Sequence, residues 1–106
     1  MWMLRALPAD ADAPLVFRLM PGHMQTIGRA PGASFIVDAP LVSRVHCRLT
    51  VADDGRVDVT DLESTNGTWI NGEKISAGSL PEGGVLRVGR VEFVLEREQT
   101  PPGQNG

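Results

Sequence analysis

Three short polar stretches of the chain carry side chains that could together hold an anion. Arg29 supplies planar, permanently charged donors that can bind two oxygens at once. Ser43 and Thr65 supply hydroxyl donors, and Asn66 carries a carboxamide with both donors and an acceptor. A phosphate monoester offers a charge of about −1.5 to −2 and three strong acceptor oxygens. Hydrogen bonds to such a charged group are worth about 1.5–3 kcal/mol each, so two or three could distinguish a phosphorylated peptide from an unmodified one.

Each of these stretches, taken alone, has an ordinary structural explanation. A pair such as Gly28-Arg29 is usually a turn followed by a solvated charge, and a pair such as Asn71-Gly72 usually closes a hairpin. A single histidine such as His46 is more often structural than functional. The anion site is therefore predicted from the whole set of residues and not from any one member.

Length, composition and charge restrict the classes of partner. The chain of 106 residues has room for one domain and one core, and no apolar run approaches the ~20 residues of a membrane-spanning helix. The net charge of −3 argues against nucleic acid or an anionic membrane as the partner. The segment from Gly28 to Thr50 is locally basic, however, and such a patch suits one small anion better than a long polyanion.

The cysteine and histidine content argues against a disulfide, a metal or another cofactor. Cys47 is the only cysteine, so no intramolecular disulfide can form. His23, His46 and Cys47 are too few for a structural zinc site, which usually needs four ligands. The amino end shows no export signal, so a cytoplasmic location is expected.

The main enzymatic alternative is a nucleophile and base formed by Ser43 and His46. Three residues apart on an extended strand they would be separated by ~10 Å and lie on opposite faces, whereas a dyad needs ~3 Å. The chain also lacks a P-loop motif. We therefore expect no catalytic residues, and a β-sandwich interaction domain that ignores phosphate remains as the alternative to an anion-binding one.

Period-two patterns separated by turns predict an all-β fold with essentially no helix. The residues of the alternating segments expected to face the core are Leu15, Phe17 and Leu19; Val45, Cys47, Leu49 and Val51; and Val91, Phe93 and Leu95. Shorter strands are expected at Trp2–Ala6, Met24–Ile27, Phe35–Val37, Val57–Thr60, Thr68–Ile70 and Val85–Val88. Many short strands at regular spacing predict a sandwich or barrel of two packed sheets.

Two segments are expected to lie outside the folded strands. Residues 8–14 read as a surface loop, and residues 99–106 are polar and rich in proline and glycine. The expected domain therefore spans residues 1–98, followed by a disordered tail or linker. Thr100 could be a phosphorylation site that folds back onto the domain, although eight residues are few for that reach.

The ordered set of motifs resembles the signature of the forkhead-associated (FHA) domain family. The matching motifs are Gly28-Arg29, Ser43-Arg44-Val45-His46, the stretch from Asp61 to Thr68 (DLESTNGT), and Asn71-Gly72. The resemblance continues through Leu80, Gly84, Val88-Gly89 and Phe93, and so covers nearly the whole chain. It implies an eleven-stranded β-sandwich that acts as a monomeric module in kinase signalling and binds a threonine-phosphorylated protein with its loops.

The resemblance also assigns roles to individual positions. The residues expected to hold the phosphothreonine are Arg29, Ser43, Arg44 and Thr65. Arg44 either flanks the phosphate or only braces its loop. Asn66 is expected to bond the peptide backbone, and Leu41 matches a position that reads the third residue after the phosphothreonine in some relatives, here with an apolar preference. The residues expected to shape the loops without touching the ligand are Gly28, His46, Gly67, Asn71 and Gly72.

Overall fold

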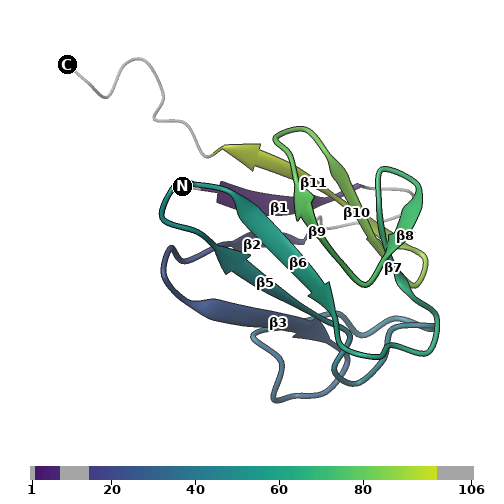
Figure 1. Ribbon diagram of the computed structural model, residues 1–106. Coiled ribbons are helices and arrows are strands. Elements are labelled where there is room, and N and C mark those ends of the chain that lie inside the picture. The colour runs from purple at the N-terminus through teal and green to yellow at the C-terminus, as the bar shows by residue number, and fades with distance from the viewer. Residues whose placement is uncertain (1, 8–14, 98–106) are drawn as a thin grey trace.

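The computed structural model describes residues 2–7 and 15–97, which form eleven strands in two sheets (Figure 1). The strands are β1 (Trp2–Ala6), β2 (Val16–Arg18), β3 (Met24–Gly28), β4 (Phe35–Ile36), β5 (Cys47–Val51), β6 (Val57–Asp61), β7 (Thr68–Ile70), β8 (Glu73–Ile75), β9 (Ala77–Leu80), β10 (Val85–Val88) and β11 (Val91–Arg97). No helix capable of spanning a membrane occurs among these residues. The predicted loop at residues 8–14 and the predicted tail at residues 99–106, with Thr100, fall outside the described residues.

The two sheets pack face to face as a sandwich, which confirms the predicted fold class. One sheet has the strand order β2-β1-β11-β10-β7-β8, and the other has the order β4-β3-β5-β6-β9. Neighbouring strands are antiparallel except for β3 and β4, which run parallel with Ile27 opposite Phe35. Figure 1 shows β3, β5 and β6 in one layer and β1, β10 and β11 in the other.

Alternating burial along the strands builds the core between the sheets. On β5 the side chains of Cys47, Leu49 and Val51 are buried while those between them are half-buried on the outer face. An aromatic cluster bridges the two layers: Phe17 stacks on Phe35 with ring centroids 4.5 Å apart and contacts Phe93 at 5.5 Å. Because these rings come from β2, β4 and β11, the cluster ties one sheet to the other.

Two residues predicted to face the core do not. Leu15 is 42% exposed and Val45 is 49% exposed. Both stand before the first residue of a strand, since β2 begins at Val16 and β5 begins at Cys47. Side chains alternate between two faces only along extended, paired backbone, so the period-two pattern overran the strands at these ends.

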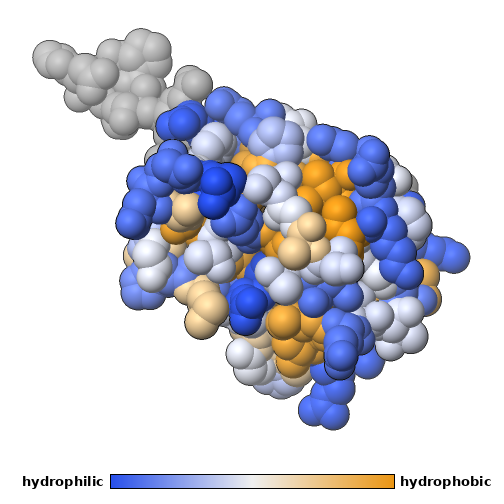
Figure 2. All heavy atoms as spheres, in the orientation of Figure 1, coloured by the Kyte–Doolittle hydropathy of each residue, from blue (hydrophilic) through white to orange (hydrophobic). Residues whose placement is uncertain are grey.

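Two edge strands, β8 and β9, were not predicted. They carry few apolar residues, because each lies at the edge of its sheet and needs only one or two side chains toward the core. On the face shown in Figure 2, hydrophobic surface gathers near the middle, where these edges meet, and hydrophilic residues surround it. Gly78 allows the close approach, since a Cβ there would lie 3.4 Å from Ile70 and 3.6 Å from Ile75.

The strand directions bring four connections to one end of the sandwich. β3, β6 and β10 end there, and β5, β7 and β11 begin there, as the lower right of Figure 1 shows. The connections are residues 29–34, 37–46, 62–67 and 89–90. All of the residues singled out as possible ligand contacts lie in the first three of these segments.

Candidate functional site

Three loops surround a shallow depression of about 380 Å³ at this end of the sandwich. Its lining residues are Arg29, Pro40, Leu41, Val42, Ser43, Arg44, Thr65 and Asn66. The structure therefore brings together all six residues that the sequence singled out as possible ligand contacts. Arg29, Arg44 and Thr65 are exposed, and Ser43 is half-buried, so their polar groups are accessible from solvent.

Ser43 connects the three loops. Its carbonyl oxygen accepts a hydrogen bond from the backbone N–H of Arg29 at 2.9 Å, and its Oγ accepts one from the backbone N–H of Thr65 at 3.0 Å. A hydroxyl that accepts one hydrogen bond can still donate its own proton. Ser43 therefore fixes the positions of Arg29 and Thr65 while its O–H remains available to a ligand.

Gly28 is required because the backbone of the next loop passes directly over it. A Cβ at this position would lie 2.1 Å from the carbonyl oxygen of Arg44, far inside van der Waals contact. The same carbonyl accepts a hydrogen bond from the backbone N–H of Ala30 at 3.1 Å. The Gly-Arg pair thus allows the β3–β4 and β4–β5 connections to lie against each other beside the depression.

Asn66 and Leu41 form a bridge across the depression. The Asn66 Nδ2 donates a hydrogen bond to the carbonyl oxygen of Leu41 at 3.1 Å. Leu41 has a φ of 71°, which is uncommon for a residue with a branched side chain and turns its carbonyl toward the neighbouring loop. Its own side chain is 42% exposed, so it presents an apolar surface beside the polar groups.

His46 lies beneath the depression and joins two of its loops. The ring is fully buried, and its Nδ1 accepts a hydrogen bond from the backbone N–H of Ser43 at 3.0 Å. Nδ1 therefore carries no proton, and Nε2 donates to the carbonyl oxygen of Gly67 at 2.7 Å. Both ring nitrogens are engaged by backbone groups, so His46 does not contact the Ser43 hydroxyl as a catalytic base would.

The β6–β7 loop is folded around the carboxylate of Asp61. Oδ1 accepts hydrogen bonds from Ser64 Oγ at 2.5 Å and Thr68 Oγ1 at 2.7 Å, and Oδ2 accepts one from the Ser64 N–H at 3.3 Å. Burial of the Asp61 carboxyl opposes its ionisation, but these hydrogen bonds together outweigh burial and hold its pKa below its usual value. The network fixes the loop that carries Thr65 and Asn66.

The sequence analysis included Asp61, Ser64 and Thr68 in a motif but gave them no role of their own. The available signal was their spacing, because an acceptor three residues before a serine and seven before a threonine is what a closed polar loop requires. The contacts themselves depend on the loop's path and could not be derived from spacing alone.

The remaining glycines and Asn71 occupy positions with positive φ. Gly67 has a φ of 91°, and a Cβ there would lie 2.9 Å from Cε of Lys74. Asn71 and Gly72, with φ of 49° and 86°, form the tight β7–β8 turn, and Asn71 exchanges two hydrogen bonds of 2.9 Å with Val85. This turn lies at the other end of β7 from Gly67, so it supports the hairpin and does not line the depression.

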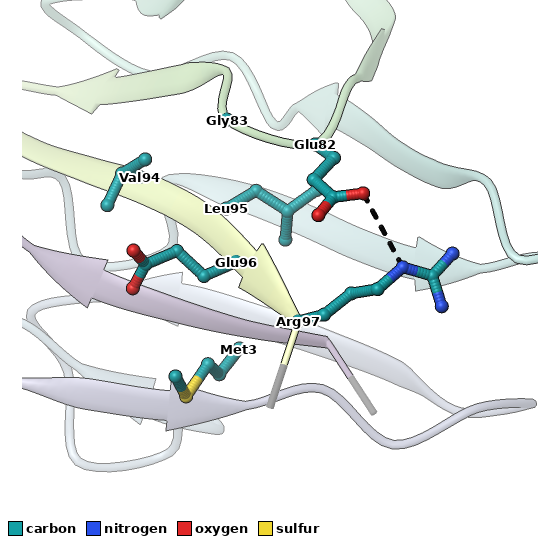
Figure 3. Close-up of a pocket in the computed structure, with 7 residues that line it drawn as sticks. All are labelled: Met3, Glu82, Gly83, Val94, Leu95, Glu96 and Arg97. Atoms are coloured by element: carbon teal, nitrogen blue, oxygen red, sulfur yellow. Dashed lines mark ion pairs between the residues drawn. The ribbon is translucent and has the colours of Figure 1, made fainter. Parts of the chain in front are cut away.

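A second depression, of about 440 Å³, has a different chemical character (Figure 3). It lies over β1, β11 and the turn at Gly83, at the opposite end of the chain's strands from the loops described above. Its cation is already engaged, because Arg97 pairs with Glu82 at 3.5 Å, as the dashed line in Figure 3 shows. Glu96 in the same wall pairs with Arg5 at 2.8 Å, so nothing here favours an anionic ligand.

Comparison with known proteins identifies the class to which this fold and site belong. The family model for the FHA domain matches residues 25–89, and the chain belongs to the FHA domain family. Over 90 residues it is 39% identical to the FHA domain-containing protein FhaA of Mycobacterium tuberculosis, covering 84% of this chain and 16% of FhaA. The chain spans between 9% and 20% of the length of the first four curated relatives it matches.

Solved structures agree with the family assignment. The FHA domain of CT664 protein from Chlamydia trachomatis superposes with a TM-score of 0.85 at 28% identity, covering 92% of this chain and 98% of that one. An FHA domain solved in work on phosphothreonine-dependent FHA domain interactions gives a TM-score of 0.81 at 28% identity, covering 93% and 98%. The likeness extends over almost all of the described residues and therefore includes the loops of the site.

Proposed function

We propose that this chain binds a phosphothreonine-containing segment of a partner protein and acts as an interaction module, not as an enzyme. The observation that carries the proposal is the convergence of the Arg29 guanidinium with the Ser43 and Thr65 hydroxyls on one exposed depression. Guanidinium and hydroxyl donors that converge in this way suit a phosphate monoester, which presents several acceptor oxygens to one side. The solved FHA domain studied for phosphothreonine-dependent interactions supports the same ligand class.

The distribution of ion pairs supports an anion at this end of the molecule. Arg5, Arg56 and Arg97 each pair with a carboxylate elsewhere on the surface. Within residues 2–7 and 15–97, Arg29 and Arg44 form no such pair, although both line the depression. An incoming phosphate would therefore meet donors that no carboxylate of the described protein neutralises. Its source would be a serine/threonine kinase acting on the partner.

Calorimetry with one peptide in phosphorylated and unphosphorylated forms tests the proposal. We expect micromolar binding of the phosphothreonine form, about −8 kcal/mol, and at least tenfold weaker binding of the unmodified peptide. Arg29→Ala should remove most of that difference without changing the melting temperature, because Arg29 is exposed and makes no core contact.

Arg56→Ala is the matched control, since it removes an exposed arginine from the β5–β6 turn at the opposite end of the sandwich. This variant should bind like the wild type. Equal affinity of the wild type for the two peptides would reject the proposal in favour of a module that ignores phosphate.

A further inference from the structure

The β10–β11 turn packs directly against the loop that lines the depression. Gly89 and Arg90 form a two-residue turn between the paired residues Val88 and Val91. Gly89 has a φ of 61°, and a Cβ there would lie 2.9 Å from the carbonyl oxygen of Leu41. The turn is held in place because the Nε of Arg87 donates to the Gly89 carbonyl at 2.9 Å.

Arg90 places a further uncommitted cation beside the site. Its side chain is exposed, and within the part of the chain that the structure describes it forms no ion pair or hydrogen bond. It follows Gly89 in the chain, and its guanidinium stands on a flexible stem of ~6 Å, long enough to reach over Leu41. The cation lies outside the depression itself, whose lining does not include Arg90.

We propose that Arg90 recognises an acidic side chain of the ligand, so that the preferred partner segment combines phosphothreonine with aspartate or glutamate. This rests on the proposed function, because the phosphate fixes the register of the peptide. Ser43 and Leu41 are two residues apart along the loop, and the turn that bears Arg90 begins against Leu41. The path from the phosphate to the guanidinium is thus ~10–14 Å, which equals three or four residues of extended peptide.

The charge balance favours an acidic residue at that spacing over any other. Arg29, Arg44 and Arg90 stand around the path of the peptide without carboxylate partners among the described residues. The phosphate can satisfy the cations near Ser43, but it cannot reach Arg90 across Leu41. A second negative group on the ligand would pair with Arg90 at little cost in desolvation, because the site is exposed.

A scan of phosphothreonine peptides tests this role. The reference peptide carries alanine at every flanking position, and each variant carries one glutamate at one of the four positions on either side of the phosphothreonine. We expect glutamate three or four residues from the phosphothreonine to tighten binding about two- to fivefold, the range for an exposed ion pair. The gain should shrink as salt rises, since exposed charges are screened.

Variants of the turn separate Arg90 from general charge effects. Arg90→Gln should abolish the glutamate gain and keep the affinity for the reference peptide, whereas Arg56→Gln, with the same charge loss at the opposite end, should keep the gain. Arg90→Glu should favour lysine over glutamate at the same position. The turn should tolerate these changes, because the positive φ falls on Gly89 and not on Arg90.

The outcomes also separate this inference from the proposed function. If no position gains from glutamate, or if the gain persists in Arg90→Gln, the role of Arg90 is overturned while phosphothreonine binding stands. If the reference peptide binds equally with and without phosphate, the proposed function and the inference that rests on it both fall.

Discussion

His46→Ala should destabilise the domain and weaken ligand binding together, although His46 does not line the depression. The substitution leaves the Ser43 N–H and the Gly67 carbonyl without partners in a fully buried position. Each unsatisfied buried group costs about 1–3 kcal/mol, so the loss is about 4 kcal/mol before any cavity term. A domain of this size has a free energy of unfolding of about 5–15 kcal/mol, and the melting temperature should fall by about 15–30 °C.

Two further variants divide that loss between the two hydrogen bonds. The side-chain oxygen of His46→Asn can replace Nδ1 as acceptor for Ser43, while the side-chain nitrogen of His46→Gln can replace Nε2 as donor to Gly67. Each variant should therefore recover about half of the stability lost in His46→Ala. Denaturant unfolding measures the free energies, and calorimetry near 10 °C measures peptide binding while the variants remain folded.

The control for this series is His23→Ala, which removes the other histidine from an exposed turn and should change neither quantity. The reasoning would be refuted by a His46→Ala variant with wild-type melting temperature. Wild-type stability with lost binding would instead place His46 among the groups that contact the ligand.

Three other substitutions or treatments have defined outcomes. Gly28→Ala forces a Cβ against the Arg44 carbonyl and should cost about 2 kcal/mol or more in denaturant unfolding, whereas Gly32→Ala, with open space around it, should be close to neutral. The lowered pKa of Asp61 means that its carboxylate stabilises the fold above pH ~4 and that this contribution disappears as the pH falls through the folded pKa. The difference in melting temperature between wild type and Asp61→Asn should therefore be largest near neutral pH and shrink in acid. Burial raises the pKa of Cys47 to about 12, so a thiol reagent at pH 8 should label it only as fast as the protein opens; rapid labelling of the folded protein would contradict its buried position.

Strands with a buried side and an exposed side were predictable from the sequence, and edge strands were not. Trp2–Ala6, Thr68–Ile70 and Val85–Val88 were predicted with the bounds that the structure shows. Each carries apolar residues at alternate positions because one of its faces covers the core. The residues of β8 and β9 obey a weaker constraint, since an edge strand contributes little to the core and its sequence can be mostly polar or small.

The convergence of the possible ligand contacts was predictable for a topological reason. Sandwich strands deliver their loops to two ends only, so polar groups that follow alternate strands have few places to go. The supports beneath them were less accessible. The bonds from His46 to Ser43 and Gly67, and the closeness of Gly28 to Arg44, depend on the exact path of irregular backbone, which no periodic pattern encodes.

The division of labour between supports and contacts explains why the site can bind without deforming the fold. Backbone positions around the depression are fixed from below, by the buried His46 ring and the Asp61 network. The guanidinium of Arg29 takes no part in that support, so its removal should leave stability intact while binding is lost. A site arranged in this way loses little conformational freedom when a ligand arrives, because the loops are already ordered. More of the free energy of the charged hydrogen bonds then appears as affinity, and discrimination between a phosphorylated threonine and an unmodified one follows from groups that the fold itself does not need.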